Sequence, residues 1–235
     1  MQQIDPAADN PYTAPQAPVA AVDDFSASGP VVYAGFWRRG AALFIDSFMV
    51  GIAYYAILIG GMFAAGFDFS QFASGAAPNP AAIGGVVVVV YVLYPLISGL
   101  YYVLQESSGA QATLGKRAVG IKVTDNQGGR LGRGHALGRW ASHLLCYFTF
   151  YIGYIMAGFT DRKRGLHDMV ASTLVVDRWA YTASPERQRP GVGGVAIAVL
   201  VVAALLVIAY IGVLLAVLVP LLQHTTDVAL PSAGG

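Results

Sequence analysis

The stretch WRRGAALFID, residues 37–46, decides the fold of this chain. It opens on two arginines, becomes apolar, and then carries Asp46 seven residues after Arg39. The apolar character runs from about residue 41 to 66 with Asp46 as its one charge, and about 20 apolar residues are enough to cross a bilayer. An ionised carboxylate at that depth costs at least about 2.5–3.5 kcal/mol unless it is paired or hydrated. We therefore expect a membrane helix in which another segment supplies a partner for Asp46.

Further apolar segments follow this first one. Residues 83–104 carry no charge and predict a second spanning helix, kinked at Pro95. Residues 195–222 are uncharged throughout and predict a last one. Residues 139–159 have the length to span but include charged and hydroxyl side chains. The composition agrees with a lipid environment, because only 11% of residues are charged, against about a quarter in soluble domains.

The distribution of Lys and Arg predicts the orientation. Two precede the first helix, none lies in 67–82, and 105–139 and 160–194 hold six each. Positive loops stay on the cytoplasmic side, so the N-terminus is expected inside and 67–82 outside. All the positive charge lies inside only if 139–159 re-enters rather than crosses, and that arrangement is favoured here. The predicted location is a bacterial inner membrane, with anionic lipid headgroups as contacts of the basic loops.

Short strands are expected on the cytoplasmic side. AVGIKVTDNQGGRL alternates and then turns at 126–129, which is typical of a β-hairpin. ASTLVVD, residues 171–177, predicts a third strand that pairs with it, and this pairing also requires both pieces on one side of the membrane. The predicted fold is an all-α polytopic membrane protein of three to four transmembrane helices, one of them open to a re-entrant reading, with a small cytoplasmic β-hairpin cap.

Several classes of function are excluded or disfavoured. The net charge of +1 gives no signal for nucleic acid. Cys146 is the single cysteine, which excludes an internal disulfide and a cysteine-cluster metal site, and a small buried hydrophobe is the favoured interpretation. The sequence contains no metalloprotease, nucleophile-elbow, P-loop or dinucleotide motif. No catalytic residue, cofactor or metal site is therefore expected, and the chain is not expected to be an enzyme.

The domain organisation follows the hydropathy and the composition. The first residues alternate Pro and Ala with polar residues and lack a signal-peptide pattern, which predicts a disordered cytoplasmic tail. The predicted units are the tail at 1–30, a membrane domain at 32–178 with helices near 41–66, 83–104 and 139–159, a linker at 179–194, an additional transmembrane helix at 195–222 and a short tail at 223–235.

Candidate functional residues are the ionisable groups in and beside the apolar segments. Arg39 and Asp46 lie two helical turns apart, about 10 Å along the axis, which is too far for a direct ion pair. Partners for Asp46 are expected from TLGKRAVGIKV, which contains Lys116, or from DRKRGLHDMVAST, which contains His167 and Asp168. Adjacent helical residues point apart, so His167 and Asp168 do not by themselves indicate an acid–base pair.

Three separated motifs, FWRRGAALFID, TLGKRAVGIKV and RKRGLHDMVASTLVV, together resemble the RDD family over about residues 32–178. The family is named for one arginine and two aspartates, and the resemblance assigns these to Arg39, Asp46 and Asp168. It implies a multi-pass membrane protein with a suspected transport role, and some members are reported to resemble sodium/proton antiporters in activity. It implies nothing about the tail or the last helix.

Two functions remain open on this reading. The polar residues form a fixed clamp that locks the cap onto the helices, in an accessory or scaffold subunit that binds another membrane protein or a second copy of itself. Alternatively, Asp46 binds Na⁺ or another cation and a proton in turn, in a small secondary transporter. Against transport, few spans are available to enclose a pathway, and the paired broken helices of many transporters are absent from the sequence pattern.

Overall fold

The computed structural model describes residues 30–64, 70, 74, 84–85 and 87–229. Its first helix, α1 (Phe36–Ala64), begins five residues before the predicted start at 41 and includes both arginines. Within the described part of the chain, two helices are long and apolar enough to cross a membrane, namely 36–64 and 194–223. The first and the last predicted helices therefore form, and this criterion supports two candidate spans.

The second apolar segment is an interrupted helix. A π-helix, η2 (Val89–Leu93), leads directly into α4 (Tyr94–Glu106). Pro95 lies in the first turn of α4 and has no N–H to donate to the preceding turn, and a widened π turn is a common way to accommodate such a gap. The helix is thus interrupted by a π turn just before Pro95, where a kink was predicted, and α4 ends two residues beyond the predicted limit of 104.

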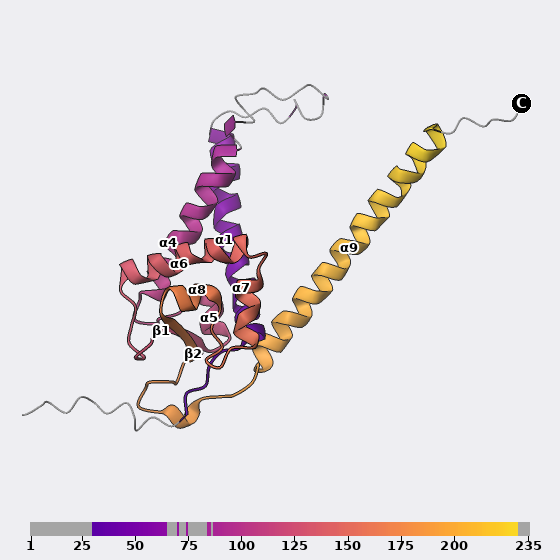
Figure 1. Cartoon of the computed structure of the whole chain (residues 1–235). Coiled ribbons are helices and arrows are strands. Elements are labelled where there is room, and N and C mark those ends of the chain that lie inside the picture. The colour runs from indigo at the N-terminus through magenta and orange to yellow at the C-terminus, as the bar shows by residue number, and fades with distance from the viewer. Residues whose placement is uncertain (1–29, 65–69, 71–73, 75–83, 86, 230–235) are drawn as a thin grey trace, which may run out of the picture.

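The third apolar segment does not form one continuous helix. It divides into α6 (Arg133–Phe148), α7 (Ile152–Ile155) and the 3₁₀ turn η3 (Met156–Gly158). Phe150 and Tyr151 have positive φ angles of 48° and 64°, which end the α-helical path between α6 and α7. Figure 1 shows α6 lying across the base of α1 and α4 rather than alongside them. The third apolar segment is thus divided, and its re-entrant course through a membrane stays a prediction.

The predicted β-hairpin is wrong. β1 (Ile121–Asp125) pairs antiparallel with β2 (Thr173–Asp177), and Val123 lies opposite Val175 in this two-stranded sheet. The turn after Asp125 is present, because its carboxylate accepts hydrogen bonds from the backbone of Gln127 and Gly129. The chain then enters α6 instead of returning as a strand. The predicted pairing of 171–177 with the first strand is confirmed.

Both edges of this small sheet are covered. Tyr33 bridges to Val176, and Ala34 N donates to Val175 O at 2.9 Å, so the segment before α1 lies along the free edge of β2. On the other side, Val123 N donates to Gln111 O at 2.7 Å. Covered edges leave no template for pairing with other chains. The cap is thus fastened to α1 through the backbone as well as through side chains.

We call the two-stranded sheet and the short helices beside it, within residues 107–131 and 165–178, the cap. The main apolar core joins α1, β1, β2 and α6 with the start of the last helix. The remaining elements are α5 (Leu114–Ala118), α8 (Leu166–Val170) and the 3₁₀ turn η4 (Pro185–Arg187).

The last helix, α9 (Gly194–Ala229), leaves the base of the molecule and diverges from α1 and α4 (Figure 1). The segment that precedes it lies beside the start of α1, because Val32 N donates to Gln188 Oε1 at 2.8 Å and Arg38 Nη1 donates to Arg189 O at 3.2 Å. The residues before α1 and those before α9 therefore lie at one end of the fold. Residues 1–29 of the predicted tail, Asp68 in the predicted outer loop and 230–235 lie outside the described residues.

Candidate functional site

Asp46 lies at a junction of three helices. It is 1% exposed, and its carboxylate accepts hydrogen bonds from the Tyr101 hydroxyl at 2.6 Å, the Thr113 hydroxyl at 2.6 Å and the Gly115 backbone N–H at 2.7 Å. These donors come from α4 and the start of α5. A carboxylate with several hydrogen bonds tolerates burial that an isolated one does not. The predicted stretch TLGKRAVGIKV does supply partners, through Thr113 and Gly115, but the expectation of a basic partner for Asp46 is wrong because all three donors are neutral.

The close approach at Asp46 depends on a glycine. A Cβ on Gly115 would lie 2.1 Å from the backbone oxygen of Ala42 and 2.9 Å from Oδ1 of Asp46. Neither position is compatible with a side chain, so the absence of a Cβ lets α5 lie against α1. The GK pair in TLGKRAVGIKV therefore has two roles, because Gly115 makes the contact and Lys116 is directed elsewhere.

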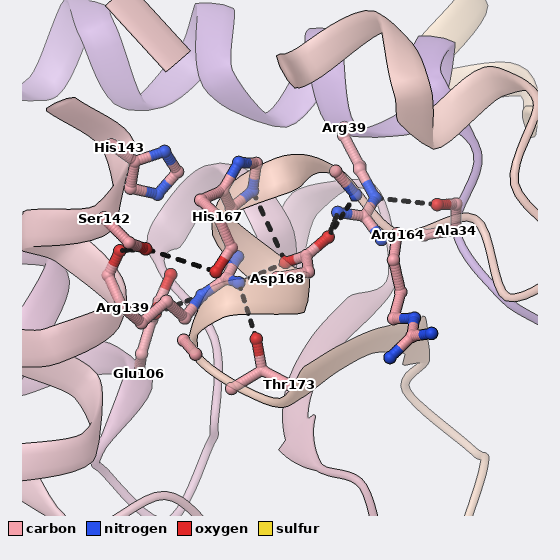
Figure 2. A network of polar contacts seen from close by, with 12 residues as sticks. Ala34, Arg39, Glu106, Arg139, Ser142, His143, Arg164, His167, Asp168 and Thr173 are labelled. Atoms are coloured by element: carbon pink, nitrogen blue, oxygen red, sulfur yellow. Dashed lines mark hydrogen bonds and ion pairs between the residues drawn. The ribbon is translucent and has the colours of Figure 1, made fainter. Parts of the chain in front are cut away.

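Arg39 and Asp168, which the resemblance matches to the family's arginine and second aspartate, contact each other directly. Nη1 of Arg39 forms an ion pair with Oδ2 of Asp168, while its Nε donates to Ala34 O at 2.8 Å. The carboxylate is fully buried and also accepts the Gly165 N–H at 2.9 Å. Figure 2 shows Asp168 between Arg39 on one side and Arg139 on the other. One carboxylate thus joins α1, α6 and α8.

Arg139 extends this network to the end of α4. It pairs with Asp168 through Nη1 and with Glu106 through Nε at 3.0 Å, and it is 2% exposed. Lys116 pairs with the other oxygen of Glu106. The network therefore reads Arg39, Asp168, Arg139, Glu106, Lys116, with charges that alternate along it. We call these five residues the charge network.

Electrostatics keeps both carboxylates ionised. Burial raises the pKa of Asp168, but Arg39 and Arg139 outweigh it and hold that pKa well below its ordinary value. Burial acts in the same sense on Glu106, and Lys116 and Arg139 lower its pKa further than burial raises it. Removing one member of such a network leaves a buried charge without compensation.

A separate ion pair fastens the sheet to α1. Arg38 Nη2 lies 2.8 Å from Oδ2 of Asp177, and its Nε and Nη2 donate at 3.0 Å to the carbonyls of Val119 and Gly120. The two arginines of the WRRG stretch thus diverge. Arg38 holds the sheet, and Arg39 holds α8.

The candidate residues from the sequence all lie in or beside these contacts. Arg39, Lys116 and Asp168 belong to the charge network, and Asp46 has its own site nearby. His167 lies beside Asp168, with Nε2 at 3.4 Å from Oδ1, and burial first of all lowers its pKa well below the ordinary value.

Sequence reasoning missed Arg139 and Glu106 as members of the network. A signal for both was present, because each ionisable side chain borders an apolar segment, and such residues are functional candidates by default. Nothing in the spacing indicated that Arg139 connects two carboxylates from different segments. That link appears only when α6 crosses the base of α4.

The fold and these sites define a small helical membrane-associated protein whose cap is fastened to its first helix by buried polar contacts. The chain belongs to the RDD family, whose family model matches residues 33–172. Arg39, Asp46 and Asp168 all lie inside the matched range. The chain is also 39% identical over 153 residues to the uncharacterized protein YxaI of Bacillus subtilis (strain 168). This match covers 61% of this chain and 96% of that protein. No solved structure matches the chain.

Proposed function

We propose that the chain is an accessory subunit or scaffold of a membrane complex. The observation that carries this proposal is that the chain itself satisfies its buried carboxylates. Asp46 accepts three hydrogen bonds from neutral donors, and Asp168 accepts from two arginines and a backbone N–H. Buried groups satisfied in this way stabilise the fold, because loss of one partner would leave the other buried without compensation.

The last helix supports a partner in the membrane. α9 lies outside the family match at 33–172, and none of its most apolar window is buried within the chain. The helix carries no charged side chain across 194–223. In a bilayer such a helix contacts either lipid or the helices of another protein, since helix association there depends on packing rather than on hydrophobic burial. We assign α9 as the membrane-embedded contact.

A basic cavity on the cap supports a partner of opposite charge. It has a volume of about 640 Å³ and is lined partly by Arg117, Lys122 and Arg178, without an acidic side chain among its lining residues. Burial lowers the pKa of Lys122, and Asp177 opposes that effect. A concave surface with several cations attracts an acidic segment and discriminates against basic ones. We assign this cavity as the cytoplasmic contact of the complex.

The remaining elements of the proposal follow from the basic loops. The chain resides in a bacterial inner membrane as a multi-pass protein, with its N-terminus in the cytoplasm and its exposed arginines near anionic headgroups. The partner is another membrane protein or a second copy of this chain. Residues 178–193 lie beside the start of α1, which supports placing the basic residues of 160–194 on the same side of the membrane as Arg38 and Arg39.

Charge reversal in the cavity tests the accessory role. Tagged full-length chain is purified from native membranes in mild detergent, and its partner is identified and its stoichiometry measured. The double variant Arg117→Glu, Arg178→Glu should lose the partner, whereas Arg133→Glu, on the exposed side of α6, should retain it. A chain that purifies alone, or a partner that binds both variants equally, contradicts the proposal.

A second candidate, cation–proton exchange through Asp46, is favoured by one observation. The hydroxyl oxygens of Tyr101 and Thr113 both lie 2.6 Å from the Asp46 carboxylate, and oxygen atoms are the ligands that hard cations prefer. Exchange requires the Gly115 N–H and these hydroxyls to release the carboxylate when a cation binds.

Proton flux in proteoliposomes driven by Na⁺, K⁺ or Li⁺ separates the two candidates. The accessory role predicts no flux from wild type, and Asp46→Asn should only lower thermal stability. Flux that Asp46→Asn abolishes while the variant remains folded would replace the accessory role with transport. Asp68→Asn serves as the carboxylate control from the predicted outer loop.

A further inference from the structure

Three metal-ligating side chains gather between α6 and α8. His143, Cys146 and His167 each offer a ligand atom, and these atoms all lie within 4.8 Å of one another. None of the three belongs to the charge network. Figure 2 shows the rings of His143 and His167 side by side, and their centroids are 4.0 Å apart.

The sequence builds this cluster from two elements. His143 and Cys146 are three residues apart on α6, so they share one face about one turn apart. His167 comes from α8, which packs on that face. Cys146 is completely buried, His167 is 4% exposed and His143 is half-buried. Two ligands from one helical turn and a third from a neighbouring element form a convergent set.

The distances are close to those of a bound ion. Sγ of Cys146 lies 3.4 Å from Nδ1 of His167. In a tetrahedral zinc site, bonds of 2.0–2.1 Å to nitrogen and 2.3 Å to sulfur place neighbouring ligand atoms about 3.3–3.6 Å apart. This pair is therefore already at the required separation, and the other ligand atoms, which lie within 4.8 Å of one another, move closer together when an ion binds.

Oxygen atoms support the outer sides of both imidazoles. Nε2 of His167 lies 3.4 Å from the Asp168 carboxylate, so Nδ1 is directed toward Cys146 while the opposite nitrogen faces an acceptor. Nδ1 of His143 lies 2.9 Å from the Tyr154 hydroxyl. A carboxylate or hydroxyl behind a ligating histidine fixes the tautomer and orients the ring toward the metal.

Two glycines allow this close packing. A Cβ on Gly153 would lie 2.8 Å from Sγ of Cys146, and a Cβ on Gly165 would lie 2.8 Å from Cε1 of His167. The backbone therefore closes over the ligand atoms on both sides. The space beside these ligand atoms therefore suits a single small ion.

We propose that His143, Cys146 and His167 form a binding site for a zinc-class divalent metal ion, with the fourth position open to water. One thiolate and two neutral imidazoles are the ligands that Zn²⁺ prefers, and they disfavour Mg²⁺ and Ca²⁺, which select oxygen. The sequence alone gave the expectation of no metal site, because it does not show that α8 brings a second histidine to the HLLC turn. The site is independent of the accessory role proposed above.

Cobalt is the spectroscopic probe for the test. Full-length chain is purified in detergent, freed of metal with a chelator and titrated with Co²⁺, whose bond to a thiolate gives a characteristic absorption band. Saturation is expected at one equivalent, and Zn²⁺ should displace the cobalt. Cys146→Ser should remove the thiolate band, and His167→Gln should weaken binding at least tenfold. His135→Gln, an exposed histidine on the same helix, should bind like wild type.

A measurement on wild type alone covers the case in which the ligand variants fail to fold. X-ray absorption of the zinc-loaded chain should give one sulfur ligand among nitrogen and oxygen ligands. Absence of a sulfur ligand overturns the proposal. The absence of a thiolate–cobalt band in wild type also overturns it. So does a cobalt affinity equal to that of wild type in folded Cys146→Ser and folded His167→Gln.

Discussion

Arg39 and Asp168, 129 residues apart in the chain, form an ion pair in which the carboxylate is completely buried. The pair joins the first turn of α1 to α8 in the cap. Arg139 reaches the same carboxylate from α6 and continues to Glu106 at the end of α4. The buried charges of α1, α4, α6 and α8 therefore compensate one another. Removal of one charge is expected to displace the other segments.

Truncation of Arg139 tests this dependence. Arg139→Ala leaves two buried carboxylates short of a cation, and loss of one partner from a buried pair costs about 3–5 kcal/mol. We expect a strongly lowered unfolding midpoint, measured by denaturant or thermal unfolding of the detergent-solubilised chain. Arg133→Ala, at the exposed start of the same helix, is the control and should change stability little. Similar midpoints for the two variants would contradict the network.

Substitution of Gly115 tests the approach of α5 to α1. The added Cβ of Gly115→Ala would meet the Ala42 carbonyl oxygen at 2.1 Å, so the backbone must move and the hydrogen bonds of Asp46 must weaken. We expect destabilisation of at least about 1–3 kcal/mol, the range of overpacked sites. The control is Gly138→Ala on α6, where a Cβ meets nothing within 4 Å and helix propensity predicts a gain of about 0.5–1 kcal/mol.

Glu106 predicts a pH dependence with a defined sign. Burial raises its pKa, but Lys116 and Arg139 hold the folded-state pKa below the ordinary value of 4.5. A lowered folded-state pKa stabilises the fold above the unfolded value, and this contribution is lost as the pH falls through the folded-state pKa. Wild type should therefore exceed Glu106→Gln in stability near neutral pH, and the gap should narrow below about pH 4.5. A stability difference between wild type and Glu106→Gln that stays constant with pH would mean that packing, and not the charge of Glu106, causes it.

Cysteine labelling tests the side on which the segment before α9 lies. Ser184→Cys in a Cys146→Ala background should resist an impermeant maleimide in intact cells and should react after permeabilisation. The reason is that 178–193 contacts the start of α1, next to residues predicted to be cytoplasmic. Ready labelling of intact cells would place the segment outside and require 139–159 to cross.

Much of the fold could be predicted from hydropathy and charge. α1 and α9 form where long apolar runs predict them, and residues 171–177 form a strand that pairs with β1 because a short strand needs an edge to pair with. The predicted hairpin is wrong although the turn after Asp125 is present. The strand that pairs with β1 begins at Thr173, 48 residues after Asp125. A local pattern identifies a strand and a turn but does not identify the distant partner.

The site was predicted in part. Asp46 was identified because charge within apolar sequence is costly and therefore informative, and the resemblance to the RDD family added Arg39 and Asp168 to it. The pairing was not: Asp46 takes hydroxyl and backbone donors, and Lys116 contacts Glu106 instead. Which donor reaches a carboxylate depends on angles between α1, α4 and α6, and spacing along the chain does not encode those angles. The sequence likewise did not indicate a metal site at the HLLC turn, because spacing along the chain does not show that α8 brings His167 beside it.

The long sequence separations within the charge network and within the Asp46 site also set an order of events during synthesis. Arg39 and Asp46 leave the ribosome before Gly115, which follows Asp46 by 69 residues, and before Asp168, which follows Arg39 by 129. At about 5–20 residues per second, Arg39 remains without its carboxylate for on the order of ten seconds. During that time the nascent first helix depends on water, headgroups or the insertion machinery to accommodate its charges. A chain that terminates before residue 168 never leaves that state.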